Sequence, residues 1–517
     1  MAQETTPPPS RTQSKASSGR KDTPSPVADS SNSADKTSPL LPIDWAPSIK
    51  YLVLLQIVAH AGMASWCASA FIPAFLQMSK FFHRSIGDMT YLVGAYTLMM
   101  GAGVLLWNPL ADRYGRRPVL LLSLSECIIA TCGVAVSKSY ASIMVARIFQ
   151  GLGVCAPLSL GAAYMKEMYP PRNRGTALGI WTLSITCGPF IAPFICGFIA
   201  HHTTWTWIIW LEALMLAAIL LFELVFLPEA VPGTPCFRNL YTLRDILVQL
   251  PTSPNTVTGD FFLTTRKTLA AVRYPSVWLA GLAFAVPYGY IAVSISSLFP
   301  VVYGALYHFS PATQGLLYLP MLIGSLLAEC GTGRAGDKCV AADLSSPLGV
   351  LIGRRNAGYA ASEKAIDAES PTFVTAIGRS EGDVRSDSTK VPEMRLVIAL
   401  LGMLICIAGL LWFGFGVEKH LHWAHLAVAT GLAAYGAQMV TSITFSYVVD
   451  CYPKSAKEVV TIMNFFRVLS SFVVLFYNQR LNKAVGYGLA FGIEAIVSGV
   501  FGLGGLGVLV AVGGKFR

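Results

Sequence analysis

Charged residues are scarce in this chain. Asp, Glu, Lys and Arg together make up 13% of its 517 residues, whereas about 25% is usual in a soluble globular domain. The sequence also lacks a Gly-Lys-Ser/Thr phosphate-binding loop, a Cys or His spacing suited to a metal ion, and the Ser-His-Asp arrangement of a hydrolase. These absences argue against a soluble protein, against ATP hydrolysis and against enzyme activity in general.

Neither the cysteines nor the positive charge indicates a further class of partner. The eleven Cys are scattered, and most lie inside apolar runs, where they serve as small packing residues. The net charge of +10 comes from Lys and Arg in the gaps between apolar runs, with no basic helix that interleaves aromatic residues. We therefore expect no disulfide framework, no metal, no cofactor and no nucleic-acid partner.

Large apolar residues are almost absent from the first 43 residues, which are rich in Ser, Thr and Pro. Such a segment buries too little apolar surface to offset the entropy of ordering, so we predict a disordered cytoplasmic tail over residues 1–43. No apolar core follows the N-terminus, which argues against a cleaved signal peptide. The first apolar run is expected to serve as the targeting signal.

Long apolar runs dominate the rest of the chain, of which 54% overall is hydrophobic. Twelve runs are long enough to cross a bilayer. Six lie in residues 44–228, a polar linker covers 229–274, and six lie in 275–517. Residues 339–391 interrupt the second set with a long polar stretch, which is either a regulatory insertion or an unspliced segment of the gene model. Two sets of six indicate two parallel halves related by an axis along the membrane normal.

The basic residues predict the orientation of these runs. Most of the Lys and Arg lie in alternate gaps, among them the linker 229–274. Because cytoplasmic loops carry the excess of Lys and Arg, we expect the linker and both termini to be cytoplasmic. The plasma membrane is the expected location, with a vacuolar or peroxisomal membrane as the alternative.

A short charged stretch, residues 108–118, separates the second and third apolar runs and contains three Arg. We predict a tight loop at the cytoplasmic surface. Its order and spacing resemble the signature loop of the major facilitator superfamily, Gly-x-Leu-Ala-Asp-Arg-x-Gly-Arg-Arg/Lys, with Asn108 in place of the first Gly. The matching residues are Leu110, Ala111, Asp112, Arg113, Gly115, Arg116 and Arg117.

This resemblance implies a gate. In the family the acidic residue pairs across the cytoplasmic mouth with the other half, which assigns that role to Asp112 with Arg116 and Arg117 as partners on its own loop. The alternative is that these cations only set topology. A degenerate copy of the loop at residues 331–338, with Asp337, follows the eighth run.

The fourth run contains Arg147, Gln150, Gly151 and Gly153 in the pattern Arg-x-x-Gln-Gly-x-Gly. It is similar to a fourth-helix motif of the same superfamily, in which the arginine is linked to proton coupling. An intramembrane arginine is costly and usually faces a partner or a wet cavity. We therefore favour a coupling role for Arg147 over a structural one, with snorkelling to the interface as another possibility.

The fifth run resembles the antiporter signature of the family, Gly-x8-Gly-x3-Gly-Pro-x2-Gly-Gly. That signature implies an exporter that exchanges drug for proton. Close packing alone explains small residues here as well, because they let helices approach. The residues concerned are Gly179, Gly188, Pro189, Pro193 and Gly197, with Ala192 and Cys196 in place of two glycines.

Residues 392–396 and 447–452 resemble a fungal branch of the drug:proton antiporters. Asp450 ends the tenth run, and Arg467 in the eleventh run is placed to answer Asp112 or Asp450 across the inner mouth. A proton-coupled carrier also needs a titratable group that is alternately exposed. Of the ionisable residues inside the runs, His60 and Glu126 are the candidates chosen.

The resemblance implies a substrate cavity lined by the first, fourth, seventh and tenth helices. Aromatic walls with few fixed charges suit a bulky amphipathic molecule. The polar and aromatic candidates on these helices are Gln56, Trp66, Tyr288, Tyr290, Ser294, Tyr435 and Gln438.

Together these patterns predict an all-α membrane protein with the major facilitator fold, twelve transmembrane helices in two six-helix halves. The expected function is proton-coupled export of a drug, toxin or secondary metabolite by a monomer, with the substrate, protons and the bilayer as partners. The alternatives are a proton symporter that imports a nutrient, organic cation or carboxylate, and a non-transporting receptor on the same scaffold.

Overall fold

The computed structural model describes residues 42–229, 261–341, 393–452 and 455–513. Within these ranges the regular secondary structure is helical throughout, and no strand occurs. Twelve helical segments are long and apolar enough to cross a membrane. They are Pro47–Phe82, Ile86–Tyr114, Arg116–Val136, Tyr140–Met168, Thr176–His202, Trp205–Phe226, Pro275–Leu306, Pro311–Thr332, Arg395–Glu418, Trp423–Cys451, Lys457–Val485 and Tyr487–Val512.

Several spans consist of more than one helix. The elements of the first half are η1 (Pro42–Asp44), α1 (Pro47–Ser69), η2 (Ile72–Ala74), α2 (Phe75–Phe82), α3 (Ile86–Tyr114), α4 (Arg116–Val136), α5 (Tyr140–Val154), α6 (Pro157–Met168), α7 (Pro171–His202) and α8 (Trp205–Phe226). Those that follow are α10 (Phe261–Ala270), η3 (Ala271–Arg273), α11 (Pro275–Tyr288), η4 (Gly289–Ile295), α12 (Ser296–Phe299), η5 (Pro300–Leu306), α13 (Pro311–Leu316), α14 (Leu319–Ala341), α17 (Glu393–Glu418), α18 (Trp423–Cys451), α19 (Ala456–Val485), α20 (Tyr487–Ser498), η8 (Gly499–Gly504) and α21 (Gly505–Val512).

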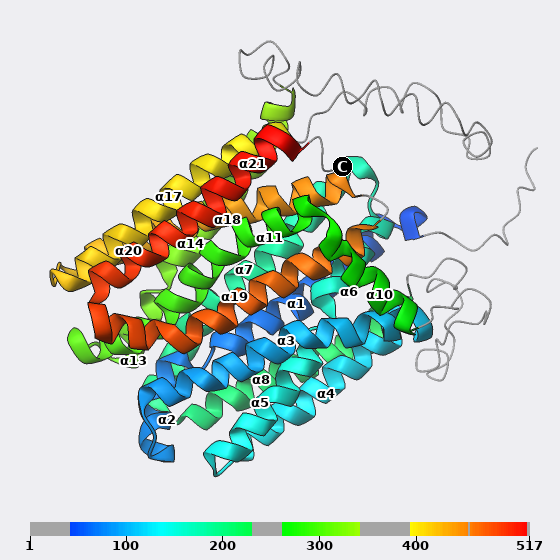
Figure 1. Ribbon diagram of the computed structural model, residues 1–517. Helices are drawn as coiled ribbons and strands as arrows, with labels where there is room; N and C mark the ends of the chain where they lie inside the picture. The colour runs from blue at the N-terminus through cyan, green and yellow to red at the C-terminus, as the bar shows by residue number, and fades with distance from the viewer. Residues whose placement is uncertain (1–41, 230–260, 342–392, 453–454, 514–517) are drawn as a thin grey trace, which may run out of the picture. The chain divides into compact units, whose positions relative to one another are not determined.

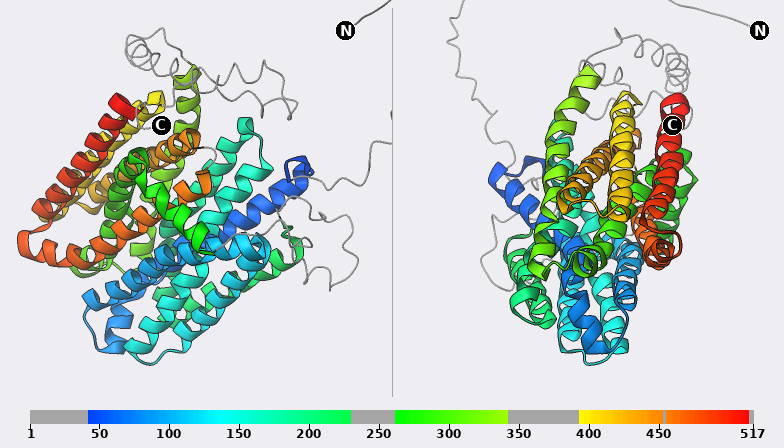
Figure 2. Two further views of the ribbon diagram at one scale, coloured as in Figure 1. Left: turned by 45° about the vertical axis from the view of Figure 1, so that its right-hand side comes forward. Right: turned by 90° about the vertical axis from the view of Figure 1, so that its left-hand side faces the viewer.

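The helices run alongside one another, with those of the first half gathered on one side and those of the second half on the other (Figures 1 and 2). The halves meet where α19 packs against α3 and α6, and where α7 packs against α13 and α14. The linker's last part, α10 and η3, also packs against this region, because α10 contacts both α3 and α19. The two halves therefore share a long interface.

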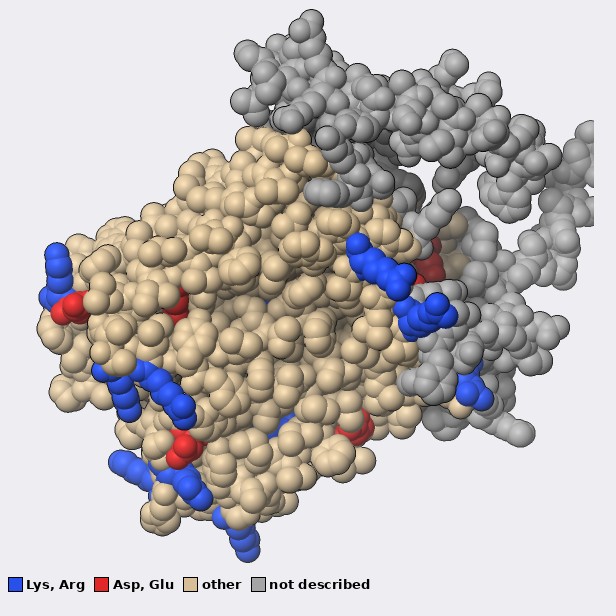
Figure 3. Space-filling view, in the orientation of Figure 1, with Lys and Arg blue, Asp and Glu red and all other residues tan. Residues whose placement is uncertain are grey.

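The outer surface suits a bilayer. Large apolar side chains are turned outward, among them Ile129, Leu214 and Ile496, which are 73%, 68% and 68% exposed. In the space-filling view, most of the Lys and Arg lie toward the two ends of the helices, and little of them shows in the broad band between (Figure 3). A soluble protein rarely exposes so much apolar surface. The chain is a multi-pass membrane protein, as the sequence predicted.

The charged stretch between the second and third spans is far tighter than predicted. Instead of a loop over residues 108–118, α3 continues to Tyr114 and α4 begins at Arg116, so Gly115 alone makes the turn. Its φ of 94° lies in the region that favours glycine. The Glu229 carboxylate accepts hydrogen bonds from the backbone N–H groups of Arg116 and Arg117, both at 3.0 Å. These bonds satisfy the free donors at the start of α4.

Two other expectations meet the structure only in part. The predicted second loop at residues 331–338 is helical, because α14 runs unbroken from Leu319 to Ala341. The side chain of Asp337 lies outside what the structure describes, as do residues 1–41 of the predicted tail, 230–260 of the linker and 342–391 of the predicted insertion.

The seventh span is irregular. Two of its segments, η4 and η5, have the wider π-helical hydrogen-bond pattern, separated by the single turn α12. π-Helical turns are uncommon and often lie at functional sites. This span contributes Tyr288, Ala292 and Ser297 to the cavity described next.

Candidate functional site

A cavity of about 520 Å³, including its opening to solvent, lies between the two halves. Its wall comes from α1, η2, α3 and α7 of the first half and from α11, η4, α12 and α19 of the second. Most of the wall is apolar, and several hydroxyl groups lie among the apolar side chains. A pocket of this size and character suits a small organic molecule. Because both halves form it, any movement of one half against the other changes its shape.

One of the predicted cavity residues is part of this wall. Of the seven predicted cavity residues, Tyr288 lines it and the other six do not. Gln56 donates to the Phe222 carbonyl at 2.8 Å, and Tyr435 packs against α14. Trp66 is 7% exposed, and its backbone nitrogen lies 3.1 Å from where a Cβ on Gly188 of α7 would be. These residues are polar or aromatic, but none of them is part of the described cavity wall.

The remaining three predicted cavity residues belong to other polar contacts in the second half. Gln438 donates to Glu329 Oε2 at 2.8 Å. Ser294 donates to Glu494 Oε1 at 2.9 Å, and the Tyr290 hydroxyl accepts from that of Tyr477 at 3.1 Å. Of the four spans that the resemblance assigned to the cavity, the first and the seventh line it, whereas the fourth and the tenth do not. The second, fifth and eleventh spans complete the wall.

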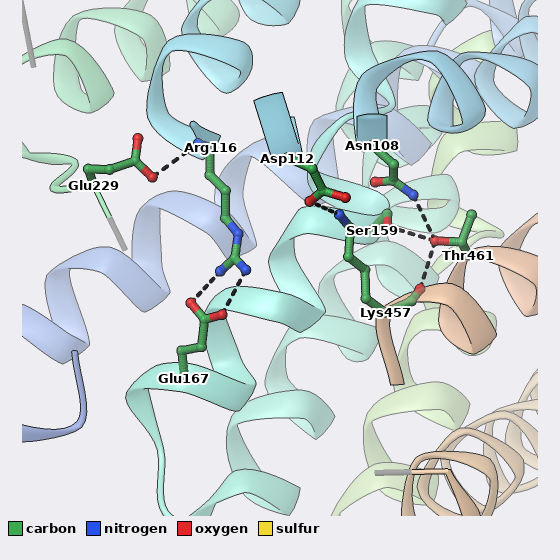
Figure 4. A network of polar contacts seen from close by, with 8 residues as sticks. All are labelled: Asn108, Asp112, Arg116, Ser159, Glu167, Glu229, Lys457 and Thr461. Atoms are coloured by element: carbon green, nitrogen blue, oxygen red, sulfur yellow. Dashed lines mark hydrogen bonds and ion pairs between the residues drawn. The ribbon is translucent and has the colours of Figure 1, made fainter. Parts of the chain in front are cut away.

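Polar contacts between the halves close one end of the interface (Figure 4). Lys457 Nζ of α19 lies 2.5 Å from Asp112 Oδ1 of α3. Beside this pair, Asn108 Nδ2 donates to Thr461 Oγ1 at 3.0 Å, and the Ser159 and Thr461 hydroxyls are 2.7 Å apart. Asp112 lies twelve residues beyond the cavity residue Met100 on the same helix, or about 18 Å along its axis. The contacts therefore close the Asp112 end of the interface, at a distance from the cavity.

The partner predicted for Asp112 on its own loop is wrong. Arg116 forms a two-pronged ion pair with Glu167 of the same half, in which Nη2 lies 2.7 Å from Oε1. Arg117 is 3% exposed and donates to the Leu224 carbonyl at 2.7 Å. Arg113 is exposed beside the Tyr114 ring. Because α4 begins directly after Gly115, its first side chains turn into their own half rather than toward Asp112.

Arg467 does not answer Asp112 or Asp450 across the mouth either. Arg395 takes Asp450, with 3.1 Å between Nη1 and Oδ2. Arg467 lies ten residues beyond Lys457 on α19, about 15 Å along the helix. There it lines the central cavity, with its guanidinium carbon 5.0 Å from the centre of the Tyr288 ring.

Arg147 is fully buried inside the first half. Two turns of α5 precede it, so it does not snorkel to the interface as one expectation allowed. Its Nη1 donates to the Cys67 carbonyl at 2.8 Å and to Gln150 Oε1 at 2.7 Å, and the guanidinium stacks on the Phe71 ring at 3.7 Å. Gln150 in turn donates to Glu212 Oε2 at 3.2 Å. The amide thus bridges a buried cation and a buried carboxylate.

The other two coupling candidates lie apart from Arg147. His60 Nδ1 is 2.9 Å from Glu223 Oε1, and neither side chain has any exposed surface. This pair joins α1 to α8 inside the first half. The Oε2 atom of Glu126 is buried and has no hydrogen-bond partner among the described residues. None of these groups lines the cavity.

A second buried carboxylate lies in the second half. Glu494 of α20 is 1% exposed and accepts the Ser294 hydroxyl, while its Oε2 atom has no partner in the described part of the chain. Asn478 Nδ2 donates to the Ser294 carbonyl at 3.1 Å and to Ser297 Oγ at 3.3 Å. Because Ser297 lines the cavity, polar contacts lead from the cavity to Glu494.

Glu212 and Glu494 were not among the residues predicted to carry the proton. One signal was available in the sequence: each stands seven residues after the start of the last span of its half, at Trp205 and Tyr487. A carboxylate at the same place in both halves is a pattern that two parallel repeats make visible. Lys457, the partner of Asp112, had no comparable signal.

The glycines of the fifth span let α7 approach helices on two sides. A Cβ on Gly188 would lie 2.8 Å from Ser65 Cβ of α1, and one on Gly197 would lie 2.7 Å from the Pro311 carbonyl oxygen of the other half. A Cβ on Gly179 would lie 2.9 Å from Glu329 Oε1. Pro189 lines the cavity, and α7 remains one helix through Pro189 and Pro193. Close packing between α7 and both neighbours is therefore a physical role of this motif.

Gly188→Ala is expected to destabilise the protein, because Ser65 and the Gly62 carbonyl at 2.9 Å leave no room for a methyl group. Overpacking of this kind costs roughly 1–3 kcal/mol. The matched control is Gly492→Ala, where no atom lies within 4 Å of the new Cβ, and where alanine favours the helix by roughly 0.5–1 kcal/mol. Thermal unfolding of the purified variants measures both effects. Equal melting temperatures for the two variants would contradict the packing argument.

Twelve spans in two halves, a cavity between the halves and polar contacts that close one end define a multi-pass membrane transporter. Residues 57–359 match the family model described as Major Facilitator Superfamily, which covers more than half of the chain. The chain belongs to the major facilitator superfamily, and it is therefore a transporter rather than an enzyme. The predicted family and fold are confirmed.

Two fungal relatives share most of their length with this chain. The MFS-type transporter hepF of Aspergillus oryzae is 25% identical over 90% of this chain and 89% of its own length. The probable efflux pump mfs2 of Aspergillus flavus is 23% identical over 86% of this chain and 98% of its own length. Among solved structures, the xylose transporter XylE of E. coli, in a partially occluded inward-open conformation, aligns with a TM-score of 0.59 and 13% identity over 88% of this chain and 97% of its own. That likeness supports the fold.

Proposed function

We propose that this protein is a proton-coupled secondary transporter that exports small amphipathic organic molecules, such as a drug, toxin or secondary metabolite. The observation that carries the proposal is the cavity between two halves that are tied together at the Asp112 end by groups from both. The efflux-pump name of the Aspergillus flavus relative supports the export direction. The mostly apolar wall with scattered hydroxyls supports an amphipathic cargo.

Alternating access follows from this arrangement. The Asp112–Lys457 pair and the Asn108–Thr461 bond join α3 to α19, so they must break before the cavity opens at that end. A contact that exists in only one of two states biases the equilibrium between them. We propose that the Asp112 end faces the cytoplasm, with both termini on that side and the protein acting as a monomer in the plasma membrane. These contacts then favour the state in which the cavity faces outward.

Proton coupling needs a group that takes up a proton on one side and releases it on the other. A carboxylate without a cation beside it is costly inside a membrane, so exchange of a proton at such a place has a large effect. Glu494 fits this description because it accepts a hydrogen bond from the neutral Ser294 hydroxyl. Glu212 is linked to the Arg147 cation through Gln150. Protonation of Glu212 would therefore alter a buried network of charges.

The direct test is substrate flux in sealed vesicles with an imposed pH gradient, over a panel of amphipathic fluorescent compounds. Export that stops when a protonophore collapses the gradient is the expected result. Uptake driven by the same gradient would replace the proposal with the symporter. Flux of no compound, in protein shown to be folded and inserted, would favour the receptor and count against transport of this cargo class.

Glu494→Gln is expected to remove gradient-driven export, by tenfold or more, while exchange of substrate without a gradient persists. The amide oxygen still accepts the Ser294 hydroxyl, but the side chain no longer titrates. Among the described residues, Tyr290 and Tyr477 lie near enough to Glu494 to be affected by its charge. Glu418 of α17 accepts a hydrogen bond from the Gly488 N–H, six residues earlier on α20. Both modes of flux should be measured in the same vesicle preparation.

The matched control is Glu126→Gln. Glu126 also has a buried carboxylate oxygen, but no described polar contact connects it to the cavity. We expect it to retain gradient-driven export. If Glu494→Gln also retains full coupling, Glu494 is not the group that carries the proton. If both modes of flux fall together, the substitution has damaged the transporter rather than its coupling.

A further inference from the structure

The cavity carries one unneutralised positive group. Arg467 is 2% exposed and lines the cavity, and its Nε and Nη2 atoms have no hydrogen-bond acceptor among the described residues. Its Nη1 atom donates to the Tyr288 hydroxyl at 3.3 Å, a long bond to a neutral group. A guanidinium has five N–H donors, so most of its hydrogen-bonding capacity is unused.

The wall offers no counter-charge. Arg467 is the charged residue of the described lining, and neither Asp nor Glu occurs in that lining. The Asp112 and Asp450 carboxylates are taken by Lys457 and Arg395. The Tyr288 ring lies against the guanidinium and stabilises the cation without neutralising it.

A buried charge without a partner is costly, and an intramembrane arginine normally faces a partner or a wet cavity. A bound anion would supply the missing acceptors. Arginine is well suited to this task, because its planar fork of donors matches the two oxygens of a carboxylate. The unused Nε and Nη2 atoms are adjacent on that fork, as a two-pronged contact requires.

The rest of the wall fits the body of such a molecule. Hydroxyls of Ser69, Thr97 and Ser471 share the cavity with Arg467. Each donates to a backbone carbonyl of its own helix, and its oxygen can accept a hydrogen bond from a ligand. Val93 and Leu475 are among the apolar groups of the same wall. An amphipathic ligand can therefore place its charged end against Arg467 and its apolar part against these side chains.

We infer that the cavity binds amphipathic organic anions, carboxylates above all, and that Arg467 is the residue that recognises their charge. The inference rests on the proposed function, because it names the chemical class of the cargo. It predicts that a ligand's negative charge, rather than its apolar area alone, decides affinity.

The test compares three probes of similar size on the purified full-length protein in detergent: 1-naphthoate, the neutral 1-naphthamide and the cationic 1-naphthylmethylammonium. Ligand-dependent thermal stabilisation over a concentration series yields a Kd for each. We expect the wild type to bind 1-naphthoate at least tenfold more tightly than the amide, and the ammonium more weakly than either. Equal Kd values for naphthoate and naphthamide, tighter binding of the ammonium, or no binding of naphthoate would overturn the inference.

Three variants assign the effect to Arg467. Arg467→Gln is expected to bring the naphthoate and naphthamide Kd values within about twofold of each other, and Arg467→Lys to keep part of the preference because it keeps the charge. Arg480→Gln is the matched control: it removes a cation from the same helix, at an exposed position that reaches the Tyr91 hydroxyl at 3.4 Å. Loss of the preference in Arg480→Gln as large as that in Arg467→Gln would also overturn the inference.

Folding and function are kept separate in this design. The unliganded melting temperature shows whether Arg467→Gln is folded, and Arg467→Lys serves as the readable variant if it is not. Binding is measured without a membrane gradient. Selective naphthoate binding without proton-driven export would therefore sink the proposed function alone, and proton-driven export with no preference for the anion would sink this inference alone.

Discussion

Asp112→Asn is expected to lower gradient-driven flux by roughly 10- to 100-fold. The substitution removes the ion pair with Lys457, whose side chain is 16% exposed and keeps its charge. Hydrogen bonds to charged groups contribute about 1.5–3 kcal/mol, and about 1.4 kcal/mol corresponds to a tenfold change in an equilibrium. The closed state at this end should lose that much relative to the open state. Flux in sealed vesicles measures the expected loss of gradient-driven transport.

Hydrogen exchange measured by mass spectrometry reports the weakening of the closed state at the Asp112 end. Amides at the start of α19 and in α6 should exchange faster in Asp112→Asn, because both segments lie at the contacts that close this end. Arg113→Gln is the control, since it alters a neighbouring charge that is exposed beside Tyr114. The double variant Asp112→Lys with Lys457→Asp reverses the pair and should restore part of the flux. Unchanged flux and exchange in Asp112→Asn would mean that the pair does not bias the two states.

Arg147→Ala is expected to lower the free energy of unfolding by about 3–5 kcal/mol, the usual cost of removing one partner of a buried charged pair. The loss leaves Glu212 buried without its cation and leaves the Cys67 carbonyl without its donor. Thermal unfolding of the purified protein, with the yield of monodisperse material, measures the effect. Arg84→Gln, an exposed arginine near Tyr140, should be close to neutral.

A double-mutant cycle separates stability from coupling at this site. If the cation and the carboxylate depend on each other, Arg147→Gln with Glu212→Gln should be more stable than the sum of the single changes by about 0.5–3 kcal/mol. Because Glu212 is proposed to contribute to coupling, that double variant should lack proton-driven flux even where it is stable. Strict additivity of the two single changes would show that Gln150 does not link them energetically.

Much of the fold follows from the sequence, because length and apolarity decide which segments cross a bilayer. The twelve spans and the two sets of six were predicted this way. Boundaries were harder. The polar residues of 108–118 read as a loop, but helices continue past the apolar region when side chains such as Glu229 satisfy the backbone donors at their ends.

Partners between distant helices could not be predicted in the same way. Asp112 was singled out, yet its observed partner Lys457 is 345 residues away along the chain, and no local pattern connects them. The resemblance assigned Arg116 and Arg117 as its partners on the same loop, but both turn into their own half. Proximity in sequence was a poor guide because a turn of one residue sends adjacent side chains in opposite directions.

The cavity shows the same limit. Polar and aromatic residues were chosen on helices known from the resemblance, but a helix presents only part of its circumference to any one neighbour. Tyr288 and Tyr290 are two residues apart, and one lines the cavity while the other meets Tyr477. Arg467 was noticed for its charge, and only the fold showed that it faces the cavity.

The two π-helical stretches of the seventh span bear on which of its side chains point into the cavity. In an α-helix each residue advances the direction of its side chain by about 100°, and a π-helical turn accommodates more residues than an α-helical one. If one hydrogen bond of Gly289–Ile295 changes its acceptor by a single position, every side chain beyond it rotates around the axis. The residues downstream, Ser297 among them, would then exchange places with their neighbours at the cavity wall. Such a rotation would let this span present two different sets of side chains to a cargo without any shift of the helix axis.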